Sequence, residues 1–144
     1  INNKNLTLRT SVIGPELKSH GEELFNWFML QEKPINGYTN AFWSGISTLE
    51  LAKAVLWAID NNITGLYNLT NGKKISKYEL LLIINKFSSK KLTINPFETL
   101  LSDKSFCDTR KEINYEIPSY DIMVQKIIKH IIDNSILYPH YKIK

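Results

Sequence analysis

Few residues of this chain combine a reactive side chain with a spacing that supports chemistry. Cys107 is the only cysteine, which excludes an internal disulfide framework and any multi-cysteine zinc site. It can be read as a reactive thiol or, as we prefer, as an incidental small residue. His130 and His140 each stand alone, and such histidines are more often structural or exposed than catalytic. The sequence therefore predicts no metal site and no thiol chemistry.

The formal net charge is +4 and the isoelectric point is about 9.1, values that raise the question of nucleic-acid binding. The basic residues are scattered, and adjacent pairs occur only at Lys73-Lys74, Lys90-Lys91 and Arg110-Lys111. No aromatic and basic array of a nucleic-acid module accompanies them. We therefore expect a solvated surface and no nucleic-acid partner, and the mild positive charge is compatible with phosphate on a smaller ligand.

Length and composition indicate one compact body. Of the 144 residues, 43% are hydrophobic and 11% aromatic, so the chain can bury a core, and we expect residues 1–144 to form a single domain. No run of about 18 apolar residues occurs, and the polar start Ile1-Asn-Asn-Lys4 does not resemble a secretory signal. We expect a soluble, cytoplasmic protein with no membrane partner.

The segment Leu6–Ile13 is predicted to be a buried strand, because it is rich in Leu, Val, Ile and Thr and ends at Gly14-Pro15. A strand of this kind is typical of a mainly parallel sheet and needs neighbours on both sides. Almost no residues precede it here. We therefore expect an open strand edge, covered by a missing N-terminal half or, in the chain by itself, by a second copy in a homodimer.

Four helices and several short strands follow in the predicted order. The first helix, 22–31, is apolar on most of its surface and should be largely buried. Capping boxes at Ser47-Thr-Leu-Glu50 and Ser76-Lys-Tyr-Glu79 start the next two. The core-facing positions should be Leu49, Ala52, Leu56 and Ile59 in the second helix, and Tyr120, Met123, Val124, Ile127, Ile128, Ile131 and Ile132 in the last. Extended pieces are predicted at 34–37, 41–45, 65–70 and 91–96.

Four stretches in this order resemble one family: 8–15, 42–54, 65–70 and 75–80, which begin with Leu8-Arg9-Thr, Phe42-Trp-Ser, Gly65-Leu-Tyr and Ile75-Ser-Lys. They resemble the C-terminal half of an extended short-chain dehydrogenase/reductase, closest to the dTDP-4-dehydrorhamnose reductase-like and other nucleotide-sugar-modifying members of polysaccharide synthesis. Residues 102–110 and 117–120 are similar to the segment before the last helix of such reductases. The resemblance implies an α/β fold, the C-terminal portion of a Rossmann-like enzyme with a short parallel or mixed sheet and about four helices.

The resemblance also implies that parts of the whole enzyme are absent. The family's dinucleotide-binding half carries closely spaced glycines, whereas no two of the six glycines here lie within three residues of each other. The family's tyrosine and lysine, four residues apart on one helix, exchange a proton during hydride transfer. Only Tyr138 and Lys142 have that spacing, and we interpret them as a decoy. We predict no catalytic residue and no NAD(P) binding by residues 1–144 alone.

By position in the family, the end of the opening strand would lie beside the nicotinamide of NAD(P), at Thr10, Ser11, Val12 and Ile13. The nucleotide-sugar substrate would face two further stretches, His20, Glu23 and Asn26 before and in the first helix, and Trp43, Ser44 and Gly45 in the next loop. Trp43 suits stacking on a sugar or base, and core packing is equally consistent with it.

Many relatives carry an Arg-Asp pair before this loop, and their arginine binds the diphosphate. Phe42-Trp43 stand there in this chain. We name Lys104 and Arg110 as substitutes, with a solvated surface role as the alternative. The sequence thus predicts the substrate-binding part of an NAD(P)-dependent nucleotide-sugar reductase. The alternatives are part of an epimerase or dehydratase, a non-catalytic binding module of the same shape, and a basic nucleic-acid-binding domain.

Overall fold

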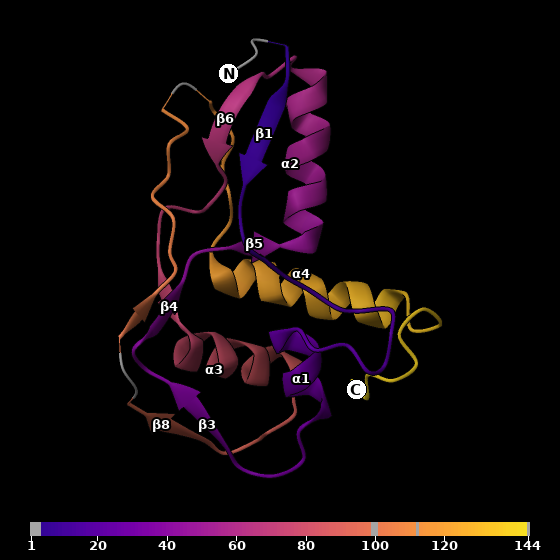
Figure 1. Ribbon diagram of the computed structural model, residues 1–144. Coiled ribbons are helices and arrows are strands. Elements are labelled where there is room, and N and C mark those ends of the chain that lie inside the picture. The colour runs from indigo at the N-terminus through magenta and orange to yellow at the C-terminus, as the bar shows by residue number, and fades with distance from the viewer. Residues whose placement is uncertain (1–3, 99–100, 112, 144) are drawn as a thin grey trace.

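The computed structural model describes residues 4–98, 101–111 and 113–143. These residues form an α/β structure with four helices (Figure 1), as predicted. The helices are α1 (Leu24–Leu30), α2 (Thr48–Asp60), α3 (Lys77–Ser88) and α4 (Tyr120–Asp133). The strands are β1 (Leu6–Arg9), β2 (Val12–Ile13), β3 (Ile35–Tyr38), β4 (Ala41–Trp43), β5 (Ile46–Ser47), β6 (Gly65–Asn68), β7 (Ile75–Ser76), β8 (Ile94–Phe97) and β9 (Ser102–Asp103). Within the described ranges every helix is too short or too polar to span a bilayer.

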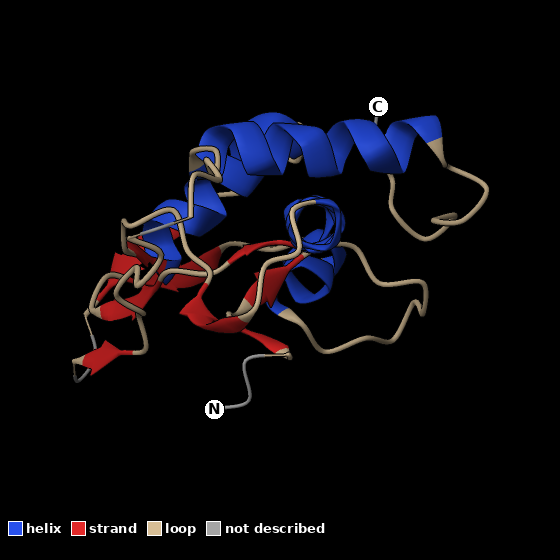
Figure 2. Ribbon diagram, turned by 90° about the horizontal axis from the view of Figure 1, so that it is seen from above, coloured by secondary structure: helices blue, strands red, loops and turns tan. Residues whose placement is uncertain are grey.

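The strands form several small sheets. β1 and β6 run parallel, from Leu6 opposite Gly65 to Arg9 opposite Asn68, and α2 lies between them in sequence. β2 pairs with β5, β3 pairs with β8, and β4 lies between β7 and β9. The strands gather on one side of α4 (Figure 2).

The opening strand, predicted as one buried segment, breaks in the structure. Thr10 donates a hydrogen bond through Oγ1 to the carbonyl of Leu69 at 2.7 Å. The carbonyl of the next residue, Ser11, accepts the N–H of Ile46 at 2.9 Å. The chain therefore leaves β6 and joins β5, which produces separate strands β1 and β2. Alternate residues of β1 are exposed, so this chain by itself does not bury the strand.

Helices α2 and α3 begin at the predicted serines, but only one has a complete capping box. Ser76 accepts the N–H of Glu79 at 3.1 Å, and the Glu79 carboxylate accepts the N–H of Ser76 at 2.9 Å. Ser47 accepts the N–H of Glu50 at 3.0 Å. The Glu50 carboxylate instead accepts the hydroxyl of Tyr115 at 2.7 Å. The reciprocal bond predicted at Ser47 is thus replaced by a long-range contact.

The buried face of α2 differs from the predicted one. Ala54 and Ala58 are buried, whereas Leu56 and Ile59 are 63% and 65% exposed. The helical periodicity identified an apolar stripe, but it did not show whether the rest of this chain covers that stripe. We call the exposed set of Ala52, Val55, Leu56 and Ile59 the α2 stripe.

The main core is shared by α1, α3 and α4. The predicted stripe of α4 is buried except for Ile132, which is 49% exposed. In α1, Phe25 and Phe28 are fully buried, but Trp27 and Leu30 are 38% and 48% exposed. A helix of seven residues buries one face only, so the predicted burial of most of 22–31 is wrong.

The helix starts provide a matched stability test. Ser76→Ala and Ser47→Ala should each lower the free energy of unfolding by about 0.5–2 kcal/mol, because each leaves a backbone N–H unpaired. Ser119→Ala is the control, since Ser119 precedes α4 without a side-chain cap hydrogen bond, and it should change the value by less than about 0.5 kcal/mol. Urea denaturation measures all three. Equal midpoints for Ser76→Ala and Ser119→Ala would contradict the cap assignment.

Candidate functional site

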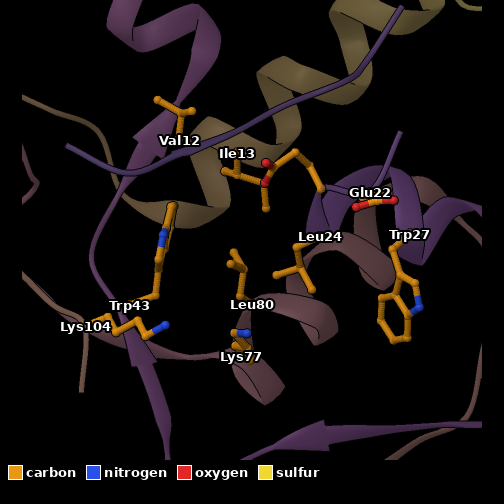
Figure 3. A pocket seen from close by; sticks show the side chains of 10 residues that line it. Val12, Ile13, Glu22, Leu24, Trp27, Trp43, Lys77, Leu80 and Lys104 are labelled. Carbon is orange, nitrogen blue, oxygen red and sulfur yellow. The ribbon is translucent and has the colours of Figure 1, made fainter. Parts of the chain in front are cut away.

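A cavity of about 370 Å³ opens beside β2, and we call it the β2 cavity. Its walls come from β2, α1, β4, α3 and the segment that follows β9. Figure 3 shows Trp43 and Lys104 on one side, Trp27 and Glu22 on the other, and Lys77 with Leu80 between them. Its volume lies within the range of small-molecule sites.

The link between β4 and β5 reaches β2 because Gly45 has no side chain. A Cβ at this position would lie 2.1 Å from the carbonyl oxygen of Ser11 and 2.1 Å from the ring of Trp43. Both distances are far inside van der Waals contact, so any other residue would push this link away from Ser11. Gly45 thus allows Trp43 to stand next to the end of β2.

Aromatic rings border the β2 cavity on two sides. Trp43 is half-buried and packs against Tyr120, with 5.9 Å between the ring centroids. Trp27 contributes its exposed ring from α1. Such rings can pack against the apolar face of a sugar or against a base.

Lysines and carboxylates give the cavity both signs of charge. Lys77 is the first residue of α3, and Lys104 is held by its backbone N–H, which donates to the carbonyl of Phe42 at 3.1 Å. In the part of the chain that the structure describes, neither ammonium group has a hydrogen bond or ion pair. Glu22 and Glu23 line the α1 side. This arrangement suits a ligand with both phosphate and hydroxyl groups.

Five residues predicted from the sequence meet in this cavity: Val12, Ile13, Glu23, Trp43 and Lys104. They come from four separate stretches of the chain. Their convergence is therefore a property of the fold.

Two other predicted residues are buried and support the walls. Asn26 is fully buried, and its Nδ2 donates to the carbonyl of Gly21 at 2.6 Å, which fixes the turn before α1. The hydroxyl oxygen of Ser44 accepts the N–H of Phe106 at 2.6 Å. Both side chains hold backbone in place and lie outside the cavity lining.

The remaining polar candidates also lie outside the lining. The Thr10 hydroxyl and the Ser11 backbone carbonyl are hydrogen-bonded at the break between β1 and β2, and His20 is exposed in the turn before α1. Tyr138 is buried beyond α4 with its ring beside His130. Within the described residues, no three His, Cys, Asp or Glu side chains gather closely enough to hold a metal ion.

Arg110 serves the fold at a different place. Its side chain is 6% exposed, pairs with Asp108 at 2.7 Å, and donates to the carbonyls of Thr70 at 2.7 Å and Tyr115 at 2.8 Å. Burial raises the pKa of Asp108, but the hydrogen bonds and charge of Arg110 outweigh it, so the pKa of this carboxyl is lowered. Because most donors of the guanidinium are engaged, the structure does not support Arg110 as a diphosphate ligand.

Sequence reasoning missed Trp27 and Lys77. Trp27 lies in an apolar helix that the sequence assigned wholly to the core. Phe25 and Phe28 are three residues apart and share one helix face, and only the different position of Trp27 around the helix could have placed it on the opposite face. Lys77 follows a helix cap, where a positive charge opposes the helix dipole. That mismatch was the available signal for a role outside helix stability.

Comparison with solved structures identifies the fold. The chain has the fold of part of an extended short-chain dehydrogenase/reductase. It is similar to dTDP-4-dehydrorhamnose reductase from Bacillus anthracis in complex with NADP, at 16% identity and a TM-score of 0.73 over 89% of this chain and 49% of that one. The resemblance inferred from the sequence is thus confirmed for the fold.

Other members share this fold. UDP-N-acetylglucosamine 4-epimerase from Methanobrevibacter ruminantium, in complex with UDP-N-acetylmuramic acid, matches at 18% identity and a TM-score of 0.65 over 88% of this chain and 45% of that one. dTDP-glucose 4,6-dehydratase from Bacillus anthracis, in complex with NAD, matches at 14% identity and a TM-score of 0.62, over 91% and 45%. The chain spans about half the length of these enzymes. No protein-family profile and no curated protein sequence matches it.

The separation of Arg110 from the cavity predicts different outcomes for two cation deletions. Arg110→Ala should lower the free energy of unfolding by about 1–3 kcal/mol, because it leaves two carbonyls and the partly exposed Asp108 carboxylate without their partner. Lys104→Ala removes an exposed, unpaired ammonium group and should change stability by less than about 0.5 kcal/mol. Thermal and urea unfolding of both variants measure the difference. Similar stabilities for the two would contradict the structural role of Arg110.

Proposed function

We propose that this chain is the substrate-binding part of an NAD(P)-dependent enzyme that acts on nucleotide sugars, with reduction favoured over epimerisation or dehydration. The observation that carries the proposal is the β2 cavity. It opens beside a parallel strand pair, where ligands of doubly wound folds bind, and it combines indole rings with unpaired lysines. The neighbours in complex with NADP, with NAD and with UDP-N-acetylmuramic acid support the same ligand classes.

Each wall of the cavity has a role in this proposal. Trp43 packs against the sugar ring, and Lys104 donates hydrogen bonds to sugar hydroxyls. Glu23 accepts hydrogen bonds from sugar hydroxyls. Together these side chains orient the sugar toward the end of β2 and exclude water from it.

The end of β2 is suited to lie beside a bound NAD(P), but it is not suited to bind the phosphates. Val12 and Ile13 form an apolar wall of the cavity, and NAD(P) bound beside this wall would carry the hydride. The hydroxyl of Thr10 is already bonded to Leu69. We propose that the phosphate-binding turn and the proton-transfer groups come from a separate dinucleotide-binding half.

The open edge of β1 is the proposed docking place for that half. The carbonyls of Asn5 and Arg9 accept hydrogen bonds from the β6 side, so the alternate residues Leu6 and Leu8 direct their backbone groups to the opposite edge. No described strand pairs there. A further parallel strand would satisfy these groups.

The α2 stripe extends the same docking surface. Trp57 packs against Tyr115 on one flank of α2, with 5.2 Å between the ring centroids, and the stripe lies on the other flank. Figure 1 shows α2 beside β1. A helix of the dinucleotide-binding half would cover this apolar surface.

Titration with nucleotide sugars tests the proposed ligand class. UDP-N-acetylglucosamine and dTDP-glucose should shift the indole NMR signals of Trp43 and Trp27, which line the cavity. The signal of Trp57, which packs against Tyr115, is the internal control and should stay. Trp43→Ala should weaken binding about tenfold, a loss of about 1.4 kcal/mol, because it removes the ring against which the sugar packs. If neither compound moves the two cavity signals at millimolar concentration, the proposed function is wrong.

The docking surface predicts self-association of the chain in isolation. Leu56→Lys and Ile59→Lys together should convert dimers into monomers, because charges on the α2 stripe would have to be buried in the dimer. Ile132→Lys is the matched control, since Ile132 is exposed on α4 outside the stripe. Sedimentation velocity at several concentrations measures the dimer fraction. A concentration-independent monomer for the unsubstituted chain would rule out self-association through this surface.

A further inference from the structure

The β2 cavity continues into a second hollow along α1. This α1–β3 cavity has a volume of about 440 Å³ and shares Leu24, Trp27 and Lys77 with the first. Beyond these shared residues it is lined by Ile35, Asn36, Tyr38 and Leu81. The two hollows are therefore adjacent, and Lys77 lies where they meet.

Lys77 is the cation best placed for the middle of a long ligand. It lines both hollows, whereas Lys104 lines only the β2 cavity. The Ser76 cap and the first turn of α3 fix its backbone. Its ammonium group has no ion pair among the described side chains. A negative group that bridges the two hollows would meet Lys77 first.

The α1–β3 cavity has the chemistry of a site for a flat, polar ring. Trp27 offers an exposed indole, and Tyr38 pairs with Phe97 at 6.0 Å between the ring centroids. Asn36 is exposed and carries both a donor and an acceptor. Stacking faces combined with one amide are suited to a nucleobase.

The backbone of β3 leaves no room for a side chain at Gly37. A Cβ at Gly37 would lie 2.7 Å from the ring of Tyr78 on α3. β3 therefore packs directly against α3, the helix that begins with Lys77. The distance between the proposed nucleobase site and Lys77 is thus fixed by tight packing.

We propose that Lys77 anchors the diphosphate of the ligand and that the α1–β3 cavity holds its nucleoside, which leaves the sugar in the β2 cavity. This inference rests on the proposed function, because the orientation follows from the sugar lying at the end of β2. It assigns Lys77, and neither Lys104 nor Arg110, as the residue that recognises a nucleoside diphosphate.

UDP, dTDP and uridine are the probes for this assignment, with the Trp27 indole signal as the reporter of binding. Lys77→Gln should weaken the binding of UDP and dTDP about tenfold, because a charge-assisted hydrogen bond is lost. It should leave uridine binding within about twofold. Lys104→Gln and Lys86→Gln are matched charge controls, and both should bind UDP within about threefold of the unsubstituted chain. Asn36→Ala should weaken uridine and UDP equally.

The outcomes separate this inference from the proposed function. If nucleotide sugars bind at Trp43 but Lys77→Gln binds UDP as well as the unsubstituted chain, the role of Lys77 is wrong and the proposed function stands. If Lys104→Gln shows the larger loss, the diphosphate lies in the β2 cavity and the assignment is reversed. If neither UDP nor a nucleotide sugar moves either indole, both proposals fail. Unchanged dispersion of the amide spectrum confirms that each variant is folded.

Discussion

The close approach of the Gly45-Ile46 link to Ser11 is the contact on which the rest of the structure depends. It transfers the opening strand from β6 to β5, because the Ser11 carbonyl accepts the N–H of Ile46. It also brings Ser47 to the position where α2 begins, and Trp43 to the end of β2. A single backbone contact thus fixes the start of α2 and one wall of the candidate site. The same contact therefore determines both the local fold and the position of the candidate site.

The polar groups of the chain divide into those that hold the fold and those left free for a ligand. Arg110 and the Tyr115–Glu50 pair belong to the first group. Burial and the neighbouring Glu50 raise the pKa of the Tyr115 hydroxyl, which keeps it protonated as a donor. Lys77 and Lys104 belong to the second group, since neither ammonium group has an ion pair among the described residues. This division, more than the net charge, indicates where an anion would bind.

Features encoded by neighbouring residues were predictable from the sequence. The capping box at Ser76 and the buried stripe of α4 need only residues three or four positions apart, and both are present. The role of Glu50 was not predictable, because its partner Tyr115 lies 65 positions away. The α2 stripe was misassigned for a related reason. An apolar stripe in one segment does not show whether another part of the same chain covers it.

The candidate site was predictable in part. The end of the opening strand and Trp43 were predicted because the stretches that contain them resemble those of one family in sequence and in order. Lys77 and Trp27 were missed because each lies in a helix whose pattern already had a sufficient explanation. Arg110 was selected by residue type alone, and only the carbonyls around it show that its donors are engaged.

The bond between Ser44 and Phe106 has a consequence for affinity. Ser44 directly follows Trp43, and Phe106 lies two residues after Lys104. Folding has therefore already fixed the indole and the backbone of the lysine relative to each other, before any ligand arrives. A ligand that touches both loses less conformational freedom in the protein than one that must order two independent loops. This side of the cavity is preorganised, so a ligand bound there would be selected by shape as well as by charge.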